Sequence, residues 1–278
     1  MTAKVKVGLA LGGGFARGMA HIGVLQALAD HQIPIDMVAG TSAGSLVGAM
    51  FCAGLDPWLL ARAAEQMNWR SLVRLKLRRE GLLDATGLER FMLGAMGDLH
   101  FKDLKVPFTA AATDLMTGEE VLLTNGRVAT AVRASCAFPG IFLPVRVGQH
   151  TLVDGGLVHP VPAAVVRRMG ADVVIAVELS RPRAETRPPR NLLHIMLYSL
   201  AVVQRPQIAL ALRDADVAIR PELNAFGVIE LERLSEMIRI GREAAVAVMS
   251  AIRTAIAQAE AARQRAAPDL QPAPVPEG

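Results

Sequence analysis

Asp36-Met37-Val38-Ala39-Gly40-Thr41-Ser42-Ala43-Gly44 places one serine at the junction of two apolar runs. The first run leads into a G-x-S-x-G pentapeptide, and a second run, from Ser45 to Cys52, follows it directly. This order predicts a buried strand, a sharp turn and a core helix, with the Ser42 hydroxyl pushed out of the fold as a nucleophile. An ordinary turn of small residues can have the same sequence, so the motif needs support from elsewhere in the chain.

A second glycine-rich turn lies near the N-terminus. Val5 to Leu11 predicts a buried strand. Gly12-Gly13-Gly14 follows at once, then Phe15-Ala16-Arg17-Gly18 and a helical stretch to about Asp30. Unhindered glycine amides suit either the oxyanion of an ester's tetrahedral intermediate or a dinucleotide phosphate. A dinucleotide loop requires G-x-G-x-x-G and an acidic residue at the end of the next strand. Here the loop is one residue longer and Asp36 begins its strand, which favours an oxyanion loop. A tight packing turn remains compatible with the same residues.

The third motif is an acidic residue at the end of a short apolar strand. Asp154 follows Leu152-Val153 and precedes Gly155-Gly156. We expect its carboxylate at the carboxyl edge of a sheet, where the ligands of open α/β sheets bind. Taken alone, Asp-Gly-Gly is a common turn sequence, so its significance depends on the other two motifs.

Together, the three motifs resemble the patatin-like phospholipase family. The glycine loop and its arginine precede G-x-S-x-G by about 25 residues, and D-G-G follows about 110 residues later. The resemblance extends over roughly residues 4–179 and includes 112–119 and 133–145. His159 is a departure, because members usually carry asparagine before this proline. The resemblance implies a three-layer α/β/α fold with a mostly parallel central sheet.

The resemblance also implies a serine hydrolase of lipid acyl esters that works through an acyl-enzyme. Ser42 would be the nucleophile, Asp154 its general base and acid, and Gly12-Gly13-Gly14 the oxyanion hole. Arg17 would either position the glycine loop or bind a phosphate of the substrate. An acyltransferase or thioesterase could use the same dyad, and a non-catalytic membrane- or protein-binding module could retain the fold.

A dyad leaves the histidines without a required catalytic role. We expect His21 to pack against the sheet or cap a loop, and His159 to sit in an extended turn before its proline. A carboxylate with an ordinary pKa of about 4 is a weak base. The surroundings of Asp154 are therefore expected to be apolar, so that desolvation raises its pKa.

Strand and helix patterns alternate along the chain, which predicts a parallel sheet covered on both faces. The expected strands are 5–11, 36–40, 106–112, 119–124, 150–154, 172–178 and 215–220. The expected helices are 18–30, 43–54, 57–67, 87–97, 127–136, 161–169, 191–212 and 230–264. The expected divisions are a catalytic core at 4–180, a basic proline-rich linker at 181–190, a helical portion at 191–265 packed on the core, and a disordered tail at 266–278.

Composition fits a single α/β enzyme domain. The 278 residues are 52% hydrophobic, which allows a substantial core. Cys52 and Cys136 stand in apolar surroundings and are expected to be buried free thiols. The scattered histidines give no metal-ligand spacing, and we expect neither a metal nor a cofactor. The uncharged stretch 37–55 contains the serine turn and four glycines, so it is expected to be core rather than a membrane span. The N-terminus lacks a cleavage signal, which favours a cytoplasmic location.

The net charge of +4 is unevenly distributed. Basic and apolar residues interleave between Arg70 and Arg79. As a basic amphipathic element, this segment could rest on anionic lipid headgroups at the periphery of a membrane, or it could be a solvated helix face. Nucleic acid is not an expected partner, because the basic run lacks aromatic residues for base stacking.

Overall fold

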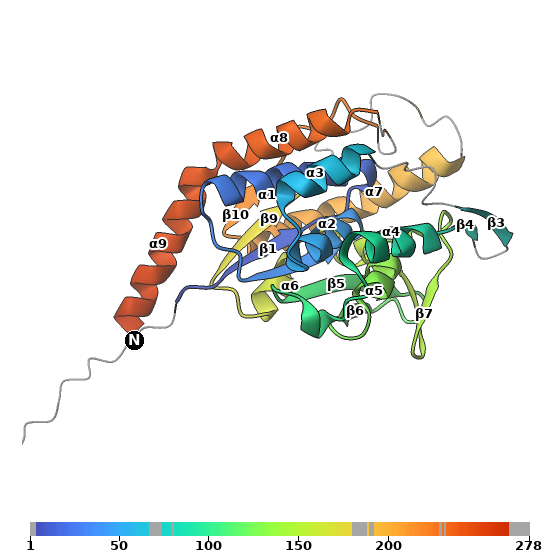
Figure 1. The fold of residues 1–278 in the computed structure, drawn as a ribbon, viewed down its shortest axis with the longest axis horizontal. Helices are drawn as coiled ribbons and strands as arrows, with labels where there is room; N and C mark the ends of the chain where they lie inside the picture. The colour runs from blue at the N-terminus through green and yellow to red at the C-terminus, as the bar shows by residue number, and fades with distance from the viewer. Residues whose placement is uncertain are drawn as a thin grey trace, which may run out of the picture.

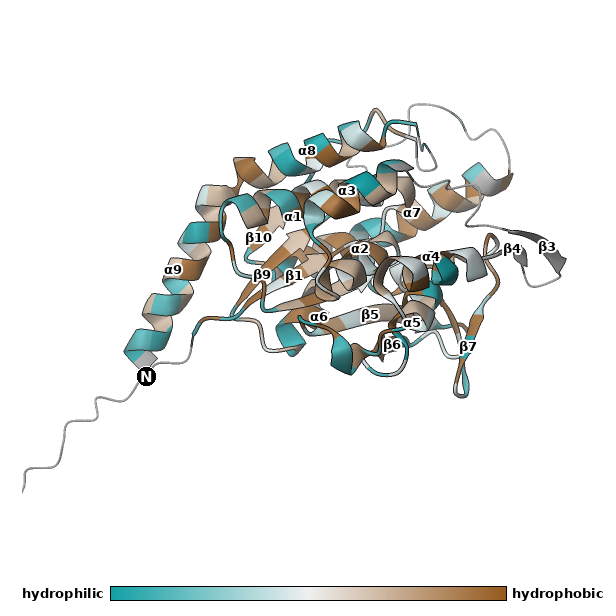
Figure 2. Cartoon of the chain, in the orientation of Figure 1, coloured by the Kyte–Doolittle hydropathy of each residue, from teal (hydrophilic) through white to brown (hydrophobic). Residues whose placement is uncertain are grey.

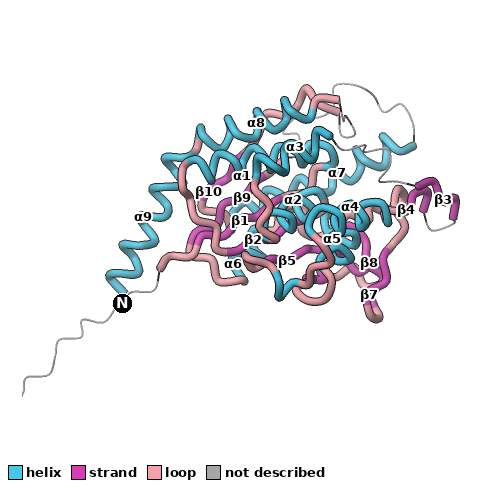
Figure 3. Tube along the Cα trace, viewed as in Figure 1, coloured by secondary structure: helices cyan, strands magenta, loops and turns pink. Residues whose placement is uncertain are grey.

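A computed structural model shows a sheet enclosed between two layers of helices (Figure 1). The structure describes residues 4–66, 74–78, 81–179, 188, 192–227, 230 and 232–266. Figure 3 shows the strands running between the helices that cover them. The three-layer α/β/α fold expected from the sequence is confirmed.

The strands are short, and those at 7–11, 37–41, 108–114 and 173–177 are fully buried. Their bounds are β1 (Val7–Leu11), β2 (Met37–Thr41), β3 (Arg74–Arg78), β4 (Gly81–Asp84), β5 (Phe108–Asp114), β6 (Glu120–Leu123), β7 (Val145–Val147), β8 (His150–Asp154), β9 (Val173–Val177) and β10 (Val217–Ile219). The helices are α1 (Ala20–Asp30), α2 (Ala43–Cys52), α3 (Pro57–Gln66), α4 (Thr86–Met96), α5 (Val128–Ser135), α6 (Ala163–Arg168), α7 (Leu192–Ala211), α8 (Leu234–Ala247) and α9 (Met249–Ala266). Short 3-10 turns include η1 (Phe15–Met19), η3 (Phe101–Asp103), η4 (Gly155–Leu157) and η5 (Leu212–Asp214).

The central sheet has the order β10-β9-β1-β2-β5-β8-β7, and β6 also pairs with β5. From β10 to β5 all neighbouring strands are parallel. Beyond β5 the pairings are antiparallel. The parallel part brings the carboxyl ends of β1, β2 and β5 to the same edge, where the glycine loop and the G-x-S-x-G turn begin.

Alternation along the parallel strands produces two separate cores. Leu9 of β1, Val38 of β2 and Ile175 of β9 face one core, which α1, α2, α3 and α8 close. Their neighbours Ala10 and Ala39 face the other, which α6 and α7 close. Because each strand buries both faces, it reads as a continuous apolar run rather than an alternating one. Figure 1 shows α1, α3 and α8 on one side of the sheet and α6 on the other.

Helices α1 and α8 cross unusually closely. A Cβ built on Gly23 would lie 1.8 Å from the Ile238 carbonyl oxygen, and one on Gly241 would lie 2.0 Å from that of Ala20. Only glycine allows the two backbones to approach this far. The crossing brings the C-terminal part of the chain onto the helix that follows the glycine loop.

Strands β1, β2, β5, β6, β8, β9 and β10 confirm the seven strands predicted from the sequence. The single helix expected at 230–264 is wrong, because the chain bends at Val248 between α8 and α9. Strand β7 was not expected. Residues 74–78 form β3, paired antiparallel with β4, so a helix face is also wrong for them. Arg70 and Arg79, most of the linker at 181–190 and the tail from 267 lie outside the described residues.

Candidate active site

The ends of two strands meet beside β5. Thr41, the last residue of β2, pairs with Ala111, while Asp154, the last residue of β8, pairs with the next residue, Ala112. Strand β6 pairs with the same part of β5, so it occupies the opposite edge. Because β2 runs parallel and β8 antiparallel to β5, their carboxyl ends point at each other. This register places Ser42, one residue beyond β2, next to Asp154.

Ser42 has the strained backbone expected of a nucleophile in this turn. Its φ is 53° and its ψ is −123°, which is unfavourable for a residue with a side chain. Helix α2 starts at the next residue, and the Ser42 carbonyl accepts hydrogen bonds from the amides of Ser45 and Leu46. Ser45 Oγ donates to the same carbonyl at 2.7 Å. The turn is thus held from the helix side, and the α2 N-terminus favours negative charge near Ser42.

The Ser42 amide lies beyond the end of β2 and makes no hydrogen bond within the sheet. It donates instead to a side-chain hydroxyl. Ser135 Oγ accepts this amide at 2.9 Å and donates to the Ala111 carbonyl at 2.6 Å. Ser135 is fully buried at the end of α5. In the sequence, this stretch contributes only to the family resemblance, and no local pattern assigns Ser135 a role.

Asp154 is 5% exposed and accepts hydrogen bonds from the side chain of Ser42 and the amide of Gly156. The Gly156 bond measures 2.8 Å. Burial raises the pKa of Asp154 to about 6, and the two hydrogen bonds oppose this shift only in part. The desolvation expected around Asp154 is therefore present. At neutral pH the carboxylate is ionised and is a stronger base than an ordinary aspartate.

The glycine loop lies directly against Ser42. A Cβ on Gly13 would be 3.5 Å from Ser42 Cβ, so the missing side chain leaves the approach open. Gly12 and Gly13 do not have free amides: they donate to the carbonyls of Val177 and Pro160, each at 3.0 Å. Within the described part of the chain, the Gly14 amide has no such acceptor. The amides of Gly12 and Gly13 therefore hold the loop in place, while the Gly14 amide is available to a ligand.

His21 holds this loop from inside the fold. Its Nε2 lies 2.8 Å from the Gly12 carbonyl oxygen, to which it donates as the Nε2–H tautomer. The side chain is fully buried, and burial lowers the pKa of His21 to about 4, so the imidazole is neutral. The loop-capping alternative expected for His21 is therefore confirmed.

Arg17 is directed into the protein. The residue is 5% exposed, and one guanidinium nitrogen donates to the Phe226 carbonyl at 3.0 Å. Phe226 precedes α8, which packs on α1, so the bond connects the glycine loop to the C-terminal helices. Of the two roles expected for Arg17, this geometry favours loop positioning over contact with a substrate phosphate.

His159 points away from the serine. Its Nε2 bonds to a Glu120 carboxylate oxygen, and Arg168 donates to both oxygens of that carboxylate. The Arg168 guanidinium is the main cause that lowers the pKa of Glu120 to about 2, with a smaller contribution from His159. Only the His159 carbonyl faces the site, where it accepts a hydrogen bond from the Thr41 hydroxyl.

Two further residues near the site were given no role from the sequence. Phe15 follows the glycine loop with a φ of 50°, and its ring packs against Phe138 with the centroids 4.9 Å apart. A positive φ at an aromatic residue signals a constraint that the surrounding structure imposes. The only sequence signal was its place in the loop, since backbone strain leaves no compositional trace.

The thiol of Cys136 also lies beside the site. Its Sγ is 3.8 Å from Ser45 Oγ. Burial and the charge of Asp154 raise the pKa of Cys136, so the thiol is neutral. Within the described residues, no group of three or more His, Cys, Asp or Glu side chains is arranged to hold a metal ion.

Comparison with known proteins agrees with this fold. The patatin-like phospholipase family model matches residues 9–167, which include the glycine loop, Ser42 and Asp154. The chain belongs to the patatin-like phospholipase family.

The similar proteins are mostly longer. An uncharacterized NTE family protein of Mycobacterium tuberculosis is 39% identical over 183 residues, which cover 64% of this chain and 50% of that protein. A second one is 30% identical over 271 residues, covering 88% of this chain and 46% of that protein. Neuropathy target esterase sws of Drosophila melanogaster is 32% identical over 181 residues, covering 62% of this chain and 13% of that protein. The chain thus spans about half the length of the mycobacterial relatives.

Among solved structures, VipD from Legionella pneumophila has a similar fold. The TM-score is 0.58 at 12% sequence identity, and the match covers 89% of this chain and 67% of VipD. At this identity the similarity concerns the fold alone.

Proposed function

We propose that this chain hydrolyses the acyl esters of lipids, with Ser42 as nucleophile and Asp154 as its only catalytic partner. The observation that carries the proposal is the contact between the Ser42 hydroxyl and the buried Asp154 carboxylate, whose pKa the hydroxyl lowers. It forms where β2 and β8 end on neighbouring positions of β5. Membership of a phospholipase family supports lipid as the substrate class.

In the first half of the reaction, Ser42 Oγ attacks the ester carbonyl carbon while Asp154 takes the hydroxyl proton. The tetrahedral intermediate collapses to an acyl-serine, and the leaving alcohol takes the proton from Asp154. In the second half, Asp154 removes a proton from a water that attacks the acyl-serine. The fatty acid departs, and the proton returns to Ser42.

The oxyanion is stabilised by amides that are not used by the fold. The Gly14 amide is the candidate within the glycine triplet, because Gly12 and Gly13 donate to backbone carbonyls. The Ala43 amide, the first in α2, is a second backbone donor to the oxyanion. In this proposal Gly12 and Gly13 keep the loop close to Ser42, while His21 and Arg17 fix its position.

Phe15 and Phe138 supply an apolar surface for the acyl chain. Phe15 follows the proposed oxyanion amide, and Phe138 lies three residues after Ser135, which holds the serine turn. In this proposal the acyl chain lies along these two rings, which are in contact with each other. Apolar walls at this position also keep water from stabilising the ionised form of Asp154.

Labelling and product analysis test the proposal together. A fluorophosphonate probe should label the wild-type protein and leave Ser42→Ala unlabelled. A panel of phospholipids, lysophospholipids, short-chain esters and acyl thioesters should release free acid only with the wild type. A preference for thioesters, or transfer of the acyl group to an added alcohol, would instead assign a thioesterase or an acyltransferase.

The opposite result would contradict the proposal. Absence of labelling in a protein with a cooperative thermal transition would revive a non-catalytic binding module. Labelling that persists in Ser42→Ala would assign the nucleophile elsewhere. Ser42→Gly is a useful second variant, because glycine accepts the positive φ without strain and so keeps the turn folded.

A further inference from the structure

Helix α7 is long and apolar but hardly buried. The segment His194–Asp214 has a mean hydropathy of 1.4, and only 11% of its most apolar stretch of 18 residues is buried inside the protein. Within the described residues, it is the one candidate for a membrane span by length and composition. Figure 2 shows much of α7 in the colour of hydrophobic residues.

The helix is apolar on two opposite faces. Leu197 and Ile208 are buried against the protein, and Gln204 lies on the same face. The outward face carries exposed apolar side chains whose spacings of three, four and seven residues keep them on one side of a helix. They are Leu192, Ile195, Met196, Val202, Val203 and Leu210. We call these six residues the α7 stripe.

The α7 stripe lies next to the candidate active site. Gln204 Nε2 donates to the Gly156 carbonyl at 2.7 Å, and Gly156 also provides the amide that bonds Asp154. Nearer the start of the helix, the stripe itself reaches this region, because the methyl carbon of the partly exposed Met196 lies over Gly140, two residues after Phe138. One face of α7 is therefore attached to the loops around the dyad, while the other is directed outward.

We propose that the α7 stripe is the surface by which this protein rests on a lipid bilayer, with the helix lying in the plane of the interface. Leu197, Gln204 and Ile208 bind the inner face to the protein, so the helix cannot cross the bilayer without leaving the fold. The outer face would enter the boundary between headgroups and acyl chains. This inference rests on the proposed lipid hydrolysis, because it places Ser42 beside its substrate.

The charges around α7 favour lipid over a second copy of the chain. The helix contains no acidic residue, and the exposed Arg205 lies beside the stripe, while Arg213 and Asp214 follow its end. In the sequence, the preceding stretch 181–190 carries four arginines and one glutamate. Pairing two such helices would bring like charges together, whereas lipid phosphates would neutralise them.

A vesicle-binding experiment separates this inference from catalysis. The parent is the Ser42→Ala protein, which cannot consume the vesicles. In the test variant Val202, Val203 and Leu210 are changed to Gln. In the matched control the same change is made at Leu59, Met116 and Val246, three exposed apolar residues outside α7. Thermal melting verifies that both variants are folded.

On vesicles of phosphatidylcholine alone, the test variant should lose at least about tenfold in partition, because three interfacial apolar side chains are removed. The control should stay within about twofold of the parent, since scattered surface residues make no shared contact. With Ser42 restored, hydrolysis of vesicle lipid should fall about tenfold relative to hydrolysis of a soluble ester. Vesicles of phosphatidylcholine and phosphatidylglycerol in equal parts should bind every variant that keeps the arginines more strongly, because anionic lipids attract these side chains.

Several results would overturn the inference. One is a test variant that binds phosphatidylcholine vesicles like the parent, and another is a control that loses as much. A parent that is dimeric without lipid and becomes monomeric when the stripe is changed would assign the stripe to a second copy. If the protein hydrolyses no ester at all but binds vesicles through α7, the proposed function fails and the docking surface stands.

Discussion

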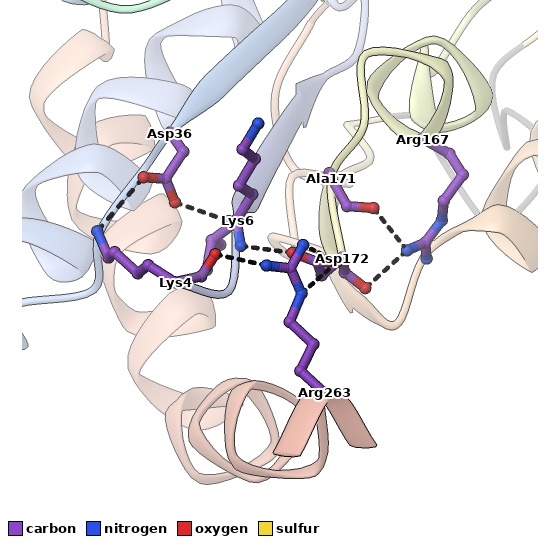
Figure 4. A network of polar contacts seen from close by, with 8 residues as sticks. Lys4, Lys6, Asp36, Arg167, Ala171, Asp172 and Arg263 are labelled. Carbon is purple, nitrogen blue, oxygen red and sulfur yellow. Dashed lines mark hydrogen bonds and ion pairs between the residues drawn. The ribbon is translucent and has the colours of Figure 1, made fainter. Parts of the chain in front are cut away.

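The two edges of the parallel sheet are built for different tasks. At the amino edge, an aspartate stands one residue before each of β2, β9 and β10. Asp36, Asp172 and Asp216 accept the amides of Val7, Lys6 and Val174, at 2.7 to 2.8 Å. Each aspartate also pairs with a basic side chain, from Lys4, Arg263 and Arg167 respectively. Figure 4 shows how Asp172 and Arg263 connect α9 to the start of the chain.

The carboxyl edge shows the opposite chemistry. Beside Ser42 the acidic residue is Asp154, which is buried and bonded to Ser42 and Gly156 without an ion pair among the described residues. Further along this edge, the buried Glu178 after β9 does pair, with Arg220 at 3.8 Å. Two residues with side chains, Phe15 and Ser42, have a positive φ there. Burial raises the pKa of Asp154. The aspartates of the amino edge are partly exposed and lie beside basic side chains.

The contrast shows where the fold stores unfavourable energy. Paired carboxylates at the amino edge tie neighbouring strands together and satisfy their first amides. At the carboxyl edge, backbone strain and a desolvated charge lower stability but prepare a nucleophile and a base. Variants at the two edges should therefore affect activity and stability in opposite ways.

Asp154→Asn is the strongest test of this contrast. Removing the base should lower kcat/KM on the order of 10⁴-fold or more. Wild-type kcat/KM should rise with pH through about 6, the pKa of Asp154, and then level off. The variant should lack this rise, which a pH profile with a soluble ester measures.

The same variant should be more stable than the wild type at neutral pH. The folded carboxyl keeps its proton up to about pH 6, whereas the unfolded chain releases it near the ordinary value of 3.8. The free energy of unfolding therefore falls as pH rises between these values, and the cost remains above them. Asparagine removes a cost on the order of 2 kcal/mol at pH 7. Urea unfolding at pH 4 and pH 7 tests this, and an equal loss of stability at both would contradict the burial argument.

His21→Ala should give a smaller loss, which distinguishes a dyad from a triad. It leaves the Gly12 carbonyl without its partner and opens a cavity under the loop, so kcat/KM should fall on the order of tenfold. The free energy of unfolding should fall by about 2 to 4 kcal/mol. His159→Gln should stay within about threefold of wild-type activity, because the imidazole faces Glu120. If either variant were folded yet as inactive as Ser42→Ala, Asp154 would not be the only partner of the serine.

Most of the fold was predictable because the central strands β1, β2, β5 and β9 are buried on both faces. Val7–Leu11 and Val173–Val177 read as continuous apolar runs, and glycines mark the turns that follow β1 and β2. The β3 strand was missed although Arg74-Leu75-Lys76-Leu77-Arg78 alternates at the period of a strand. The bend at Val248 has neither proline nor glycine, so nothing in the local sequence separates α8 from α9.

For the site, the sequence indicated which residues carry the chemistry but not how the fold uses their amides. Ser42 and Asp154 stand in motifs with a mechanism, and β5 brings them together. The Gly12 and Gly13 amides donate to the carbonyls of Val177 and Pro160, which are far along the chain. Ser135 likewise acts through a long-range hydrogen bond that no local pattern encodes.

The smallest effects are expected from substitutions at the amino edge, which should lower stability without changing activity. Asp172→Ala removes the acceptor of the Lys6 amide and the partner of Arg263, so the free energy of unfolding should fall by about 2 kcal/mol. Lys4→Ala is the matched control, because its ammonium is largely exposed and lies 3.4 Å from Asp36. Its loss should be under about 0.5 kcal/mol, since exposed ion pairs are screened by solvent, and the Lys4 carbonyl keeps its bond to Arg263.

Both variants should retain wild-type turnover per folded molecule well below the thermal transition. A drop in turnover for Asp172→Ala under these conditions would show that the two edges are coupled, and the division of tasks between them would fail.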